Sequence, residues 1–122
     1  MQPNKEAILR GLREVPGEKV GAILVGHSHY DHLGDLPVIA GELMPRARLY
    51  LNRAGANALF PFVKLRARRT VLEELNMQPT LLTDADGRPL PFRVTPVLSG
   101  HAPHLGPLTL WTGDVKESDQ RW

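Results

Sequence analysis

The histidines are the residues of this 122-residue chain best suited to chemistry. All five fall in two short segments, His27, His29 and His32 in the first and His101 and His104 in the second. The chain has no cysteine, so any transition metal must be held by imidazoles and carboxylates. In an extended stretch, side chains two residues apart point the same way, so His27 and His29 can reach one point in space. Asp31 and His32 follow a bend and would face a second point nearby, which suits two metal ions.

The ligand types in the first segment indicate which metal they would hold. Neutral imidazole and carboxylate fit Zn²⁺ best, with Fe or Mn as alternatives. The alternative without a metal is three surface histidines in a polar loop, each hydrogen-bonded to water. The H-x-H-x-D-H spacing favours the metal site, since histidine is the commonest metal ligand.

A strand and a helix are predicted to flank this segment. The continuous apolar run at residues 20–25 predicts a strand buried on both faces. Asp35 is placed to cap a helix with an apolar stripe that includes Leu36 and Ile39. Because a helix connects them, a second strand at residues 47–51 is expected to run parallel to the first.

Beyond this unit, helices are expected first and strands later. Residues 52–77 have a helical pattern interrupted at Pro61, and a capping box from Thr70 to Glu73 predicts the start of a short helix. Strands are expected at residues 80–83, 90–98 and 108–112, with a turn at Asp86 and Gly87 between the first two. With no internal repeat and no linker, residues 1–122 are predicted to form a single α/β domain.

The charge balance excludes some classes of partner. Fifteen basic against 13 acidic residues give a formal charge of +2, too small to indicate binding to nucleic acid. No apolar run approaches the ~18 residues of a membrane span, and the N-terminus lacks a signal-peptide pattern. We therefore expect no transmembrane segment and, by default, a cytoplasmic location. One basic run is interpreted as a solvated helix face, with a collar for an anionic substrate as the alternative: Lys64, Arg66, Arg68 and Arg69.

The segment GHSHYDHLGDLP resembles the signature loop of the metallo-β-lactamase-fold hydrolases. This resemblance implies an αβ/βα sandwich with metals at the edge between two sheets. It also implies that His27 and His29 are ligands of the first metal, and that Asp31 and His32 are ligands of the second. Tyr30 between them resembles the branch with phospholipase D-like and lactonase-like members.

The same resemblance gives roles to the second histidine segment. His101 occupies the place of the histidine that completes the first site, and three imidazoles would leave one coordination position open, as in catalytic zinc sites. His104 is a candidate substrate-facing residue, and the alternative is a loop histidine that caps local backbone. Asp114 is similar to the family's bridging carboxylate. However, only the 12 residues 102–113 separate it from His101, so we interpret it as a surface turn residue.

These features predict a zinc-dependent hydrolase with one or two ions, in which metal-activated water attacks an ester, lactone or phosphodiester. Asp31 would be the catalytic residue that orients or deprotonates this water. No histidine follows His104, so the chain is expected to be the N-terminal portion of the fold, truncated at its C-terminus. The alternative is a non-catalytic metal-binding fragment that lacks the rest of the binuclear site. The substrate is expected to be a small or lipid-like molecule, and an uncovered sheet would allow self-association.

Overall fold

A three-stranded parallel sheet lies at the centre of the computed structural model, which describes residues 3–98 but not the side chains of Tyr30 and Asp31. Its strands are β1 (Ala22–Val25), β2 (Arg48–Leu51) and β3 (Arg69–Val71), in the order β1-β2-β3. β1 and β2 pair in parallel with Ala22 opposite Arg48, as the sequence predicts. A separate antiparallel pair consists of β4 (Thr80–Thr83) and β5 (Pro89–Val94).

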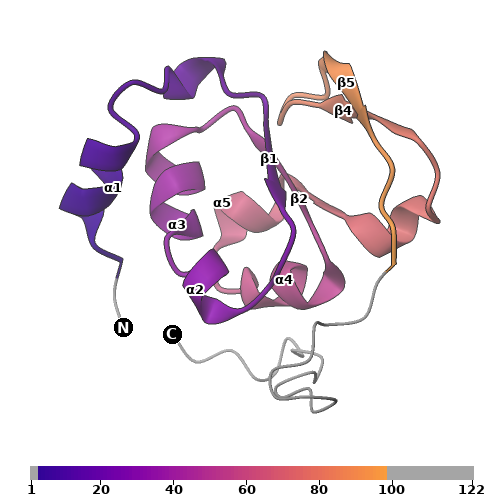
Figure 1. Cartoon of the computed structure of the whole chain (residues 1–122), viewed down its shortest axis with the longest axis horizontal. Helices are drawn as coiled ribbons and strands as arrows, with labels where there is room; N and C mark the ends of the chain where they lie inside the picture. Colours follow the sequence, from indigo (N-terminus) through magenta and orange to yellow (C-terminus); the bar gives the residue numbers. More distant parts are fainter. Residues whose placement is uncertain (1–2, 99–122) are drawn as a thin grey trace, which may run out of the picture.

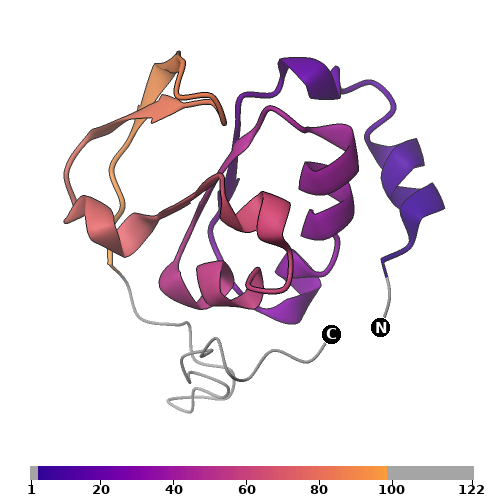
Figure 2. The same cartoon turned by 180° about the vertical axis from the view of Figure 1, so that it is seen from behind.

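The helical segments are short. They are α1 (Lys5–Gly11), η1 (Gly17–Lys19), α2 (Tyr30–Leu33), α3 (Leu36–Val38), the π-helical turn η2 (Ile39–Leu43), α4 (Arg53–Ala58), α5 (Val63–Arg66) and η3 (Leu72–Leu75). α3 and α5 lie on one side of the parallel sheet, and the β4–β5 hairpin lies on the other (Figures 1 and 2). None of the helices between residues 3 and 98 is both long and apolar enough to cross a membrane.

The core forms between the parallel sheet and its helical layer. Leu49 and Leu51 of β2 are fully buried there, and Ile23 and Val25 of β1 pack against the same cluster. The other buried members of the cluster are Leu33, Leu36, Ala40, Ala56, Ala58, Leu59, Leu65 and Val71. The expectation that residues 20–25 are buried on both faces is wrong, because the Leu24 side chain is 53% exposed. The strand buried on both faces is the middle strand, β2.

The segment predicted to be helical from residue 52 to residue 77 contains a strand. Helices α4 and α5 are present, but Thr70 lies in β3, opposite Tyr50 of β2, and does not cap a helix. Thr70 and Val71 are β-branched, which suits a strand, and Val71 is buried. Pairing with β2 therefore outweighs the local capping signal, and η3 begins only after the strand.

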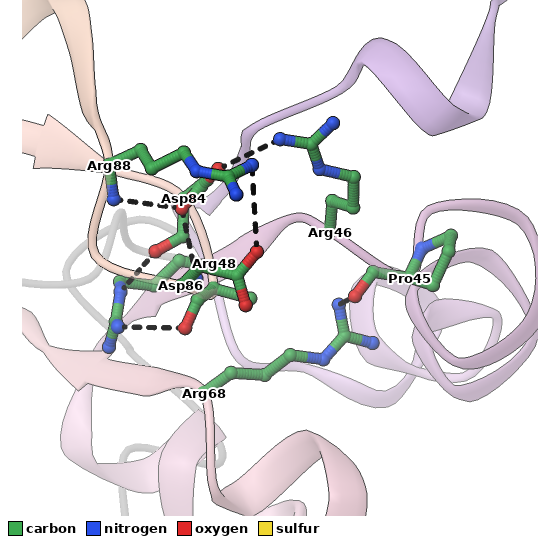
Figure 3. Close-up of polar contacts among 8 residues, drawn as sticks. Pro45, Arg46, Arg48, Arg68, Asp84, Asp86 and Arg88 are labelled. Atoms are coloured by element: carbon green, nitrogen blue, oxygen red, sulfur yellow. Dashed lines mark hydrogen bonds and ion pairs between the residues drawn. The ribbon is translucent and has the colours of Figure 1, made fainter.

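The basic run beside α5 is not a uniformly solvated helix face, and the interpretation fails at two of its four residues. The Arg68 guanidinium donates to the carbonyl oxygens of Met44, Pro45 and Ala47 at 2.6–2.9 Å, and also to that of Ala40. Figure 3 shows the hydrogen bond to Pro45. Burial lowers the pKa of Arg68. Arg69 likewise donates to a backbone carbonyl oxygen in α4. The side chains of Arg68 and Arg69 therefore link this part of the chain to residues 40–47 and to α4.

The β4–β5 hairpin is fastened to the opposite face of β2 by polar contacts. The buried Tyr50 hydroxyl accepts from the Thr83 backbone N–H at 2.7 Å and lies 3.2 Å from its carbonyl oxygen. Arg48 donates to the carbonyl oxygens of Asp84 and Ala85 (Figure 3). Alternate residues of one strand point to the same face, which is why Arg48 and Tyr50 both reach the hairpin.

A buried carboxylate organises the turn between β4 and β5. Asp84 accepts from the backbone N–H groups of Asp86 and Arg88 at 2.9 Å and pairs with Arg46 at 3.3 Å. The Arg88 N–H contributes most to lowering the pKa of Asp84, and burial opposes this effect. Gly87 has a φ of 82°, so the predicted turn at this position is confirmed. The second predicted strand ends at Val94 and not at residue 98, and the strand predicted at residues 108–112 lies outside the described residues.

Helices α1 and α3 differ in how their first turns are capped. Asn4 caps α1 by accepting from the Ala7 N–H, which is the geometry expected of an N-cap asparagine. A helix follows Asp35, but the Asp35 side chain makes no capping hydrogen bond. The helix predicted there continues from α3 into η2.

Candidate metal centre

The first histidine segment lies at the carboxyl end of β1. Gly26 leaves the strand, residues 27–29 form an irregular loop, and α2 begins at Tyr30. The backbone N–H groups of His32 and Leu33 both donate to the carbonyl oxygen of His29. Leu33 is 2% exposed and belongs to the core cluster. The helical turn is therefore anchored in the core, and the bend that the sequence predicts is one turn of helix.

This bend brings three imidazole rings together. The ring centroids of His27 and His29 are 4.1 Å apart, and those of His27 and His32 are 5.1 Å apart. The interplanar angles are 73° and 82°, so both pairs meet edge to face. His27 and His29 thus lie on one side of the loop, as the alternation of side chains predicts, and the turn of α2 places His32 beside His27.

The donor set suits a divalent transition metal as part of a larger ligand shell. Imidazole nitrogens bind Zn²⁺, Fe and Mn in proteins, and neighbouring rings allow several nitrogens to approach one region of space. Among residues 3–98, leaving Asp31 aside, no three His, Asp or Glu side chains are arranged to hold an ion by themselves. A complete site would therefore need further ligands, and Asp31 and His101 are the ones that the sequence predicts.

A mainly apolar pocket adjoins the rings. Its volume is about 210 Å³. His27 and His32 form part of its wall, and the remaining wall comes from β1, the turn after it, and the α3–η2 segment: Ile23, Leu24, Val25, Gly26, Leu36 and Ile39. The space beside the histidines could therefore take an apolar group.

Sequence reasoning missed a contact between this loop and the end of β2. The side-chain amide of Asn52 donates to Ser28 Oγ at 3.2 Å, and its Oδ1 accepts from the Gly55 N–H at 2.8 Å. Asn52 follows a strand and precedes a helix, a position typical of an N-cap. No sequence pattern indicates the contact with Ser28, which lies 24 residues earlier.

The remaining predicted site residues lie outside the described part of the chain. These are His101, His104 and Asp114, the last of which is predicted to be a surface turn residue. The Asp31 backbone is part of α2, but its side chain is not described.

Comparison with known proteins agrees with the fold. The family model of the metallo-beta-lactamase superfamily matches residues 3–116. The chain therefore belongs to the metallo-beta-lactamase superfamily, and its α/β structure is that of a domain of this class. No curated protein and no solved structure matches the chain.

Proposed function

We propose that this chain binds zinc through its histidine segments and hydrolyses an ester, lactone or phosphodiester bond. The observation that supports this most strongly is the cluster of His27, His29 and His32 at the carboxyl end of β1. It occurs in a chain of the metallo-beta-lactamase superfamily, whose fold suits a metal-dependent hydrolase.

The ligand assignment follows the family resemblance. His27, His29 and His101 would hold the first ion, and Asp31 and His32 would contribute to the second. When bound, such an ion would lower the pKa of coordinated water to about 7 and polarise a carbonyl or phosphoryl oxygen. The imidazoles must be neutral to act as ligands, so metal binding competes with their protonation. Asp31 would orient the attacking water or accept its proton.

The pocket supports a preference within the proposed substrate class. Five of its lining side chains are aliphatic, and its volume is about 210 Å³. Burying an apolar substrate group there would contribute roughly 25 cal/mol per Å² of apolar surface. We therefore expect an ester or lactone with an apolar group beside the scissile bond to be a better substrate than a phosphodiester without one.

The test is metal-dependent hydrolysis by the purified chain. The chain is stripped with chelator, reloaded with zinc, and assayed with p-nitrophenyl butyrate, p-nitrophenyl acetate and bis(p-nitrophenyl) phosphate. We expect turnover that depends on zinc, is abolished in His29→Ala, and has a higher kcat/KM for the butyrate than for the acetate. Arg13→Ala, which changes a 73% exposed side chain, is the control and should retain activity.

Two results would contradict this proposal. Hydrolysis that persists in both the metal-free chain and His29→Ala would show that the histidine cluster is not the active site. Tight zinc binding without turnover of any of the three substrates would favour the non-catalytic metal-binding alternative.

A further inference from the structure

A hydrogen bond connects the histidine loop to the residue that follows the neighbouring strand. Asn52 immediately follows β2, and its side-chain nitrogen donates to Ser28 Oγ at 3.2 Å. Ser28 separates His27 from His29 in the chain. A hydrogen bond to this one side chain therefore restrains the backbone that carries both imidazoles.

Asn52 is itself held firmly. Its Oδ1 accepts from the Gly55 N–H at 2.8 Å, and its carbonyl oxygen accepts from the Ala56 N–H. The side chain thus caps α4 with its oxygen and reaches the histidine loop with its nitrogen. An aspartate at this position could accept from the Gly55 N–H but could not donate to Ser28, because only the amide has both a donor and an acceptor.

Close packing reinforces the same contact. A Cβ added at Gly55 would lie 3.1 Å from Asn52 Oδ1 and 3.5 Å from Ser28 Cβ. The start of α4 therefore approaches the histidine loop so closely that a Cβ at position 55 would crowd Asn52 and reach van der Waals contact with Ser28. Gly55 is buried, which is consistent with this approach.

We infer that Asn52 is a positioning residue for the metal centre, acting through Ser28 to fix the loop that carries His27 and His29. This inference rests on the proposed function, since the loop is taken to present metal ligands. Residues that orient metal ligands without touching the metal typically change metal affinity by 10- to 100-fold when they are removed. In their effect on the histidine loop, Asn52 and Ser28 should behave as one unit, because the hydrogen bond between them transmits that effect.

The experiment separates the bridge from the helix cap. Ser28→Ala removes the acceptor and leaves the cap intact. Asn52→Ser keeps a residue type that caps helices well but is too short to cap α4 and reach Ser28 together. Asn4→Ser is the matched control, because Asn4 caps α1 in the same way and is not part of the hydrogen bond between Asn52 and Ser28.

Co²⁺ titration, followed by visible absorption, measures affinity and ligand geometry together. We expect Ser28→Ala and Asn52→Ser each to weaken Co²⁺ binding by about 10-fold or more and to alter the absorption spectrum at saturation. The double variant should bind no more weakly than the weaker of the two single variants. Asn4→Ser should match the wild-type chain, and the metal-free Tm of Ser28→Ala should stay close to the wild-type value.

Measurements on the metal-free chain distinguish failure of this inference from failure of the proposed function. Backbone NMR order parameters at residues 27–29 should fall in Ser28→Ala. If the wild-type chain binds no Co²⁺ but these order parameters fall, the bridge restrains the loop and the proposed metal function is wrong. If the wild-type chain binds Co²⁺ and Ser28→Ala matches it in affinity and spectrum, the positioning role is wrong and the proposed function stands.

Discussion

Replacing Tyr50 by Phe should remove the hydrogen bonds between the Tyr50 hydroxyl and the Thr83 backbone, which connect the β4–β5 hairpin to the parallel sheet. Tyr50 is 2% exposed, and its hydroxyl accepts from the Thr83 N–H at 2.7 Å. The residue opposite Thr83 in β5 is Pro89, which has no N–H to donate. The Tyr50 hydroxyl, 3.2 Å from the Thr83 carbonyl oxygen, therefore supplies a donor that the hairpin lacks at this position.

The size of the stability loss in Tyr50→Phe depends on the Thr83 backbone groups that are left without a hydrogen-bond partner. Removing one partner of a buried hydrogen bond costs about 1–3 kcal/mol, because the other partner stays desolvated. Thr83 is half-buried, so water can compensate in part, and we expect a loss of about 1–2 kcal/mol in the free energy of unfolding. For a domain of this size, each 1 kcal/mol lowers Tm by roughly 4–8 °C.

Urea unfolding gives the free energy, and hydrogen exchange locates its origin. In Tyr50→Phe, the Thr83 amide should exchange faster relative to amides in β1 and β2. Thr83→Val is the control, because it removes only the hydroxyl 3.4 Å from Tyr50 and keeps the backbone contact, so it should cost less. A Tyr50→Phe chain as stable as wild type, with its Thr83 amide still protected, would refute this account of how the hairpin docks.

Three other perturbations test the interior contacts by urea or thermal unfolding. Arg68→Met should lower the free energy of unfolding by about 2 kcal/mol or more, because hydrogen bonds from a charged donor are worth about 1.5–3 kcal/mol. Arg68→Lys should recover only part of this loss, because an ammonium lacks the planar fork of a guanidinium. Equal stability of the wild-type chain and both variants would contradict this role. Gly17→Ala should destabilise the chain, because its Cβ would overlap a carbonyl oxygen in η2. Gly11→Ala, with open space around it, should be neutral or stabilising by up to about 1 kcal/mol. A Gly17→Ala chain more stable than the Gly11→Ala chain would contradict the packing at Gly17. Asp84 has a lowered pKa, chiefly through a turn N–H, so its contribution to stability is fully present above pH ~3.9 and is lost as the pH falls through the lower folded pKa. Below pH ~4, the Tm of Asp84→Asn should therefore fall less steeply than that of the wild-type chain. Parallel plots of Tm against pH for the two chains would contradict this assignment.

Local sequence patterns predict β1, β2 and their parallel pairing well. The apolar runs of these strands and the helix between them lie in one continuous stretch, so periodicity and connection rules suffice. β3 is different, because its three residues pair with β2 and carry a capping-box pattern that favours a helix. Pairing with the middle strand, together with the β-branched side chains of Thr70 and Val71, decides its conformation.

The site shows the same division between local and long-range information. The proximity of His27 and His29 follows from side chains that alternate along an extended loop. The contact between Asn52 and Ser28 depends on how the ends of β1 and β2 align in the sheet, with Val25 opposite Leu51. That register is not visible in either segment alone, so the sequence gives no sign of the bridge.

The zinc content of the purified chain after dialysis tests the central claim most directly. Three imidazoles suffice for a tight site, whereas Asp31 and His32 alone would hold a second ion weakly. We predict one tightly bound zinc per chain, its loss in His29→Ala, and little change in Asp114→Ala. A wild-type chain that keeps no zinc, or a His29→Ala chain that keeps as much zinc as wild type, would contradict the assignment of a metal centre to the histidine cluster.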